Sequence, residues 1–214
     1  MKFCFGPAVL RLISLLLVVA LVLCSRPASA QGSSPAETAV VFYADAHVTD
    51  PIWAPLFDEF QAEVNAERQE YPLPEHFKLI RATTLATGQG FGRIVEVRLI
   101  GRCDVAEQAY RPLPHGPLGW VVRASGEIQP FIFVDCARVA QYLGPSTRGL
   151  NENQRRAAMA RAISRIAIHE WIHIETQSDR HESRGIRQPE LSSHDLIQDL
   201  IHDQIGVSRI PGGR

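Results

Sequence analysis

A single long helix is expected between Asn151 and about Gln177, and it organises the whole chain. Asn151 has an N-cap side chain and Gln154 follows three positions later, which is the arrangement of a capping box. Good helix formers continue from Arg155 to Arg161. With the strands and shorter helices predicted elsewhere, this helix indicates an α+β fold.

Two histidines in this helix are spaced for metal binding. His169 and His173 are four residues apart, so both lie on one helical face, about 6 Å apart along the axis. Two imidazoles at that separation can hold one Zn²⁺ at roughly 2.1 Å each. Glu170 is offset by about 100° from His169, which directs its carboxylate beside the ion. There it can take a proton from zinc-activated water, so the pattern predicts a general base.

The run His169-Glu170-Trp171-Ile172-His173 resembles the signature of the zincin metallopeptidases, especially small secreted bacterial zincin-like proteins. In those proteins a third histidine and then a glycine-hydrophobic pair follow, and here these positions hold His181 and Gly185-Ile186. The resemblance is specific over residues 161–188. It implies a zinc-dependent endopeptidase with His181 as third ligand. It also implies a small mixed sheet packed on two main helices, with a short C-terminal helical subdomain.

The third zinc ligand has three candidates. In the metzincin register Asp179 takes the ligand position, although Thr176 stands where those proteins have a glycine. In the gluzincin arrangement a later carboxylate binds, for which Glu190 is the candidate. Four extended residues span about 13 Å, so a turn near Gln177 could return either Asp179 or His181 to the helix. Because imidazole suits zinc, we rank His181 first, Asp179 second and Glu190 third.

The first thirty residues have the parts of a cleaved signal peptide. A basic start precedes an apolar run over residues 12–23, and Ala28-Ser29-Ala30 supplies the small residues of a cleavage site. The run is shorter than the roughly 20 residues of a spanning helix. We therefore expect cleavage after Ala30, no stable membrane anchor afterwards, and a secreted or periplasmic protein. A lipoprotein anchored at Cys24 is the alternative.

Cleavage would leave Cys103 and Cys136 as the two cysteines. In an oxidising compartment such a pair tends to form a disulfide, which would contribute about 3–4 kcal/mol. Two buried free thiols are the alternative.

The overall composition excludes several classes of protein. A hydrophobic content of 45% and a charged content of 21% are ordinary for a globular chain and exclude a disordered tail or a collagen-like fibre. The net charge of −1 offers no basic surface for nucleic acid. A peptide or protein substrate is the expected partner.

Residues 31–38 are expected to form a disordered leader, and residues 39–214 a single domain. Apolar and β-branched runs predict the strands. They are Ala39–Tyr43, Phe77–Ile80, Ile94–Ile100, Trp120–Ala124 and Phe131–Val134. By analogy with proteases, we expect the strand Phe131–Val134 to pair with an extended peptide.

Three further helices are predicted. Asp50 and Pro51 mark the start of a helix over residues 52–68, with Asp50 as its cap. A short helix covers Ala137–Leu143, and a last amphipathic helix starts at Ser193. His194 and His202 are placed on the polar face of that last helix, from which they could reach the free ring nitrogens of zinc ligands. The remaining histidines, His47, His76 and His115, have no partner at ligand spacing and are expected to be surface or hydrogen-bonded residues.

Two other functions remain open at this point. One is a catalytically inactive zincin-like protein of the cell envelope that binds metal or acts as a scaffold. Glu170 speaks against it, because a storage site needs no base. The other is a structural periplasmic domain without metal.

Overall fold

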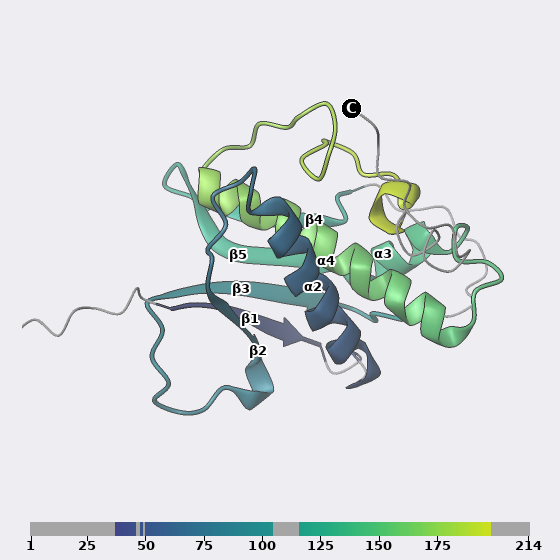
Figure 1. Ribbon diagram of the computed structural model, residues 1–214, viewed down its shortest axis with the longest axis horizontal. Coiled ribbons are helices and arrows are strands. Elements are labelled where there is room, and N and C mark those ends of the chain that lie inside the picture. The colour runs from purple at the N-terminus through teal and green to yellow at the C-terminus, as the bar shows by residue number, and fades with distance from the viewer. Residues whose placement is uncertain (1–36, 46–47, 49, 105–115, 198–214) are drawn as a thin grey trace, which may run out of the picture. The chain divides into compact units, whose positions relative to one another are not determined.

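The computed structural model describes residues 37–45, 48, 50–104 and 116–197. In these ranges a five-stranded mixed sheet carries helices on one face (Figure 1). The expected mixed sheet and its helices are therefore confirmed. The predicted signal peptide, leader residues 31–36 and the last helix beyond residue 197 lie outside the described residues.

The sheet has the strand order β2-β1-β3-β5-β4. Neighbours among β1 (Thr38–Ala44), β2 (Phe77–Arg81), β3 (Arg93–Ile100) and β5 (Glu127–Asp135) are parallel, and β4 (Gly119–Ala124) is antiparallel to β5. All five predicted strands are confirmed, each extended by at least one residue. Strand β1 begins one residue earlier than expected and includes Thr38, so Thr38 belongs to the sheet and not to the leader.

The strand order corrects one prediction. β5 pairs with β3 on one side and with β4 on the other, so its backbone groups are already used. The prediction that Phe131–Val134 pairs with an extended peptide is therefore wrong. Among the described strands it is β4 that borders β5 and forms the edge of the sheet on this side.

Alternation along β3 separates the two faces of the sheet. Val95, Val97 and Leu99 are buried in the main core under the helices, while Ile94 and Ile100 are exposed on the other side. Apolar residues occur on both faces of this strand, which is why the sequence pattern alone did not sort them. The second face carries a smaller apolar cluster formed by Ala39, Val41 and Ile80, against which Leu85 and Phe91 pack.

Helix α2 (Trp53–Glu67) follows a 3₁₀ turn over Asp50–Ile52. It buries Trp53, Leu56, Phe60 and Val64, and Phe60 packs edge-on against Phe42 of β1. Asp50 does not cap the helix, because its carboxylate forms an ion pair with Arg81 at 3.0 Å. That part of the prediction is wrong.

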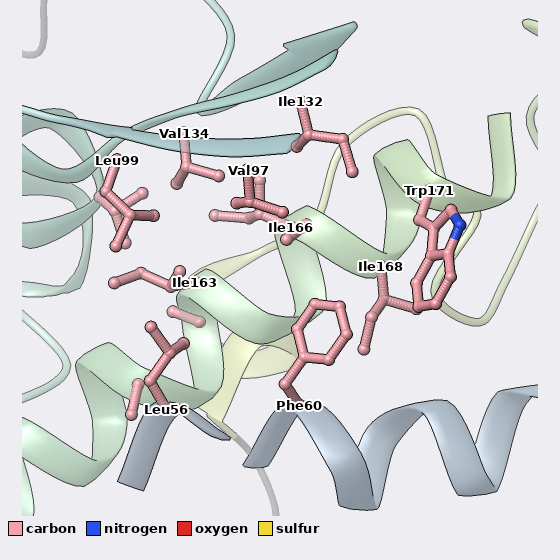
Figure 2. Packing of buried hydrophobic residues seen from close by; sticks show 14 of the residues in the cluster. Leu56, Phe60, Val97, Leu99, Ile132, Val134, Ile163, Ile166, Ile168 and Trp171 are labelled. Atoms are coloured by element: carbon pink, nitrogen blue, oxygen red, sulfur yellow. The ribbon is translucent and has the colours of Figure 1, made fainter. Parts of the chain in front are cut away.

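Helix α4 (Glu152–Thr176) is the long helix expected from the sequence, and both hydrogen bonds of the capping box are present. From Ala158 onward most of its residues are buried, because α4 lies between the sheet and α2 (Figure 2). Trp171 is fully buried and stacks on Phe60 of α2 with ring centroids 5.8 Å apart. Two ion pairs, Arg161–Glu59 at 2.8 Å and Arg165–Glu63 at 2.6 Å, also join the two helices. α4 is thus held on both sides.

Helix α3 (Cys136–Leu143) starts at a disulfide. Cys136 is bonded to Cys103, which follows β3, so the predicted cysteine pair is confirmed. A helical turn also begins at Ser193, and Leu196 and Ile197 are buried as its predicted apolar stripe requires. None of the helices within the described ranges combines the length and apolar character needed to cross a bilayer.

Removal of the disulfide should destabilise the fold. A Cys103→Ser/Cys136→Ser double variant should lose about 3–4 kcal/mol in the free energy of unfolding, because the bond restricts the unfolded chain. Urea unfolding of the variant and of the oxidised parent measures this difference. Reductant should lower the parent's transition midpoint and leave the variant's unchanged, whereas equal midpoints in oxidised parent and variant would contradict the prediction.

Candidate metal centre

Three histidines converge at the C-terminal end of α4. His169 and His173 lie one turn apart with their Nε2 atoms 3.0 Å from each other. The ring of His181, in the loop after the helix, has its centroid 5.3 Å from that of His169 and 5.0 Å from that of His173. One ring nitrogen from each of the three lies within 4.8 Å of the others. The expected set of three imidazoles is therefore brought together.

Backbone carbonyls fix the orientation of the two helical histidines. Nδ1 of His169 lies 2.7 Å from the carbonyl oxygen of Ile186, and Nδ1 of His173 lies 2.5 Å from that of Ser178. A carbonyl oxygen only accepts hydrogen bonds, so each Nδ1 carries the hydrogen and donates. In the neutral rings the lone pairs are then on the two Nε2 atoms, which face each other.

Two facing lone pairs require a positive charge between them, either a proton or a metal ion. Burial lowers the pKa of His169 to about 4 and also lowers the pKa of His173, so the protonated ring is disfavoured at neutral pH. Two zinc ligands at about 2.1 Å in tetrahedral geometry would lie roughly 3.4 Å apart, close to the 3.0 Å observed between the Nε2 atoms. These donors fit a small divalent cation.

A turn after α4 returns the chain to the helix, as predicted. Gln177 ends the helix in the left-handed conformation, with φ of 49°. Gly185 provides a second reversal at φ of 79°, a conformation that glycine adopts at little cost. Between these two turns lies His181, while Ser178 and Ile186 at either end supply the carbonyls that orient the helical histidines.

The other two ligand candidates lie elsewhere. The side chain of Asp179 is 86% exposed and forms an ion pair with Arg123 at 3.5 Å. Glu190 is exposed on the wall of the neighbouring cavity. Neither belongs to the group of histidines that could hold a metal. Of the three candidates, the described structure favours His181.

Glu170 lies at the wall of a cavity beside these histidines. The cavity has a volume of about 370 Å³ and is bounded by α3, α4, the start of β4 and residues 188–191, with His169 also on its wall. Glu170 is 9% exposed, and burial raises the pKa of its carboxyl to about 7. A Cβ added to Gly119 of β4 would meet Ile166 at 2.4 Å and Glu170 at 3.6 Å, so glycine is required for this close packing.

Sequence reasoning missed several of these contacts. The partners of the histidine Nδ1 atoms are backbone carbonyls, not His194, which is exposed and outside the histidine group, nor His202, which lies outside the described residues. His76 is exposed as expected, and His47 and His115 lie outside the described residues. Nothing in the sequence marked Gly119 as part of the site, apart from its position directly before a predicted strand.

No protein-family model, curated protein or solved structure matches this chain. Membership of the zincins therefore stays a prediction based on the motif.

Each of the three histidines should be needed for tight zinc binding. Alanine at position 169, 173 or 181 should weaken zinc affinity by at least about 100-fold, more than typical losses for residues that only support a ligand. Competition with a chromophoric chelator measures the affinity. His194→Ala is the matched control and should bind zinc like the parent. Parent-like affinity in His169→Ala would contradict a centre built on this group.

Protons should compete poorly with zinc at this site. An unperturbed histidine has a pKa of about 6.5, so zinc affinity at ordinary histidine ligands falls below that pH. The lowered pKa values of His169 and His173 keep both rings neutral to lower pH, so zinc affinity should begin to fall at a lower pH than at ordinary histidine ligands. Zinc affinity measured at a series of pH values from about 8 to 5 would test this. A steep loss that begins at about pH 6.5 would contradict it.

Proposed function

We propose that this protein is an exported, zinc-dependent hydrolase that cleaves peptide bonds, with His169, His173 and His181 as zinc ligands and Glu170 as general base. The observation that supports this most directly is the place of Glu170. Its buried carboxyl lies on the wall of a cavity that also contains His169, the first of three clustered histidines. A metal, a base and space for a substrate would then meet at one point.

The ionisation of Glu170 suits a base. When bound, zinc supplies a Lewis acid that polarises a carbonyl group and lowers the pKa of water to about 7. Burial raises the pKa of Glu170 to about 7, so near neutral pH its carboxylate can take up a proton and the resulting acid can give it back. In peptide hydrolysis the proton taken from water would pass from Glu170 to the leaving amine nitrogen.

The position of β4 supports an extended peptide as substrate. β4 pairs with β5 on one side and lies at the edge of the sheet, where a peptide can add as a further strand. Gly119 at the start of β4 lies close to Glu170. A peptide bound along β4 would therefore pass the proposed general base.

The disulfide supports export, since such bonds persist mainly in oxidising compartments. An inactive metal-binding or scaffold protein could use the same three histidines. It would gain nothing from the carboxyl of Glu170, whose burial costs free energy when the group is ionised.

Replacement of Glu170 separates the hydrolase from the inactive metal-binding protein. Glu170→Gln should retain zinc affinity and lose at least about 100-fold in hydrolysis rate, because the amide cannot accept the proton. Digestion of a random peptide library by the zinc-loaded protein, followed by mass spectrometry, measures the rate.

Glu152→Gln is the matched control, in the exposed first turn of the same helix, and should cleave like the parent. Equal cleavage by the Glu170→Gln variant and the parent would overturn the role of Glu170. Zinc binding without cleavage in the parent would favour the inactive protein.

A further inference from the structure

We propose that Arg187 is a positioning residue of the metal centre, which holds His181 where it can complete the coordination. This inference rests on the proposed zinc site. Arg187 is in the loop that follows α4, and its side chain contacts both residues that flank His181 in the sequence.

The contacts of Arg187 enclose the third histidine. Its Nη2 donates to the carbonyl oxygen of Arg180, and its Nη1 donates to the carboxylate of Glu182 at 3.3 Å. A backbone hydrogen bond joins the same two residues, because the amide of Glu182 donates to the carbonyl oxygen of Arg187 at 2.9 Å. Arg180 and Glu182, which flank His181 in the sequence, are thus both hydrogen-bonded to Arg187.

Arg187 is itself anchored to the body of the domain. It is 8% exposed, and its guanidinium lies over the ring of Tyr71 at 5.7 Å from the centroid. The hydroxyl of Tyr71 donates to the other carboxylate oxygen of Glu182 at 3.1 Å. Tyr71 is buried and follows α2, so this cluster links the loop to the helical core.

The same residue is adjacent to the carbonyl that orients His169. Ile186 directly precedes Arg187, and its carbonyl oxygen accepts the hydrogen bond from Nδ1 of His169 at 2.7 Å. Arg187 touches none of the three imidazoles through a hydrogen bond described here. The hydrogen bonds of its guanidinium go to the two neighbours of His181, so the proposed positioning role concerns that ligand.

A physical reason for this arrangement lies in the exposure of His181. His169 and His173 are held by a buried helix, whereas His181 is exposed on a loop. An unanchored loop would have to lose conformational freedom when the metal binds, and that loss would weaken the affinity. Arginine suits the role because its planar fork can donate to the Arg180 carbonyl and the Glu182 carboxylate together, which a single lysine ammonium does less well.

The test compares zinc affinities of the parent, Arg187→Ala, Arg187→Lys, His181→Ala and the His181→Ala/Arg187→Ala double variant. Arg187→Ala should weaken zinc binding by about 10–100-fold, and lysine should restore only part of the loss. In the double variant the arginine change should have no further effect, because its target is already absent. Arg184→Ala, an exposed arginine of the same loop, is the matched control and should bind like the parent.

Visible absorption of bound Co²⁺ gives a second readout, since it depends on the number of ligands. The Arg187→Ala spectrum should shift from that of the parent toward that of His181→Ala, because His181 would complete the coordination less often while His169 and His173 stay bound. Independent losses that multiply in the double variant, or parent-like affinity in Arg187→Ala, would overturn the role of Arg187 and leave the zinc site standing. Absence of zinc binding in the parent, or equal zinc affinities of the parent and the His169→Ala variant, would instead overturn the zinc site.

Thermal unfolding and circular dichroism show whether Arg187→Ala retains the fold. If it does not, Glu182→Gln serves in its place, because that side chain is half exposed and its change weakens the same contacts. It should reduce zinc affinity in the same direction by a smaller factor. Unchanged affinity in Glu182→Gln and Arg187→Lys would then count against the proposal.

Discussion

The C-terminal half of α4 is buried between a sheet and a helix, and the chemistry of the candidate site depends on that burial. Water is removed from His169, His173 and Glu170 together. Desolvation favours the uncharged form of each group, which lowers the two histidine pKa values and raises that of the carboxyl. The neutral imidazoles are ready to bind a cation, and the carboxyl is balanced between its two forms near neutral pH.

Burial of the two helical imidazoles is tolerated because backbone carbonyls accept hydrogen bonds from their Nδ1 atoms. The loop after α4 supplies carbonyl oxygens from Ser178 and Ile186 to the two buried imidazoles. The same loop carries His181. One short segment therefore both orients two of the candidate ligands and provides the third, so its conformation matters as much as that of the helix.

Much of the fold and the core of the site could be predicted from local patterns. The capping box of α4, the five strands and the helical spacing of His169 and His173 all depend on neighbours within a few residues. The position of His181 followed from a resemblance and a turn near Gln177.

Features that depend on distant partners could not be predicted. Strand order decides that β5 is enclosed and β4 lies at an edge, and no pattern within either strand states that order. Asp50 does not cap its own helix and instead forms an ion pair with Arg81, which is distant in the sequence. The acceptors at Ser178 and Ile186 are backbone atoms, which any residue type provides. Arg187 has no spacing that marks it, because its partners are arranged only by the folded loop.

Gln177 lies outside both the helix and the sheet, yet it joins them. Its side-chain amide donates to the carbonyl oxygens of Ile128 and Ile174, while its oxygen accepts from the amide of Ile128 at 2.9 Å. Ile128 in turn faces Arg123 on β4. One carboxamide thus fastens the C-terminal end of the helix that carries the histidines to β5, the neighbour of the edge strand β4, so a single side chain fixes how far the helix end lies from that part of the sheet.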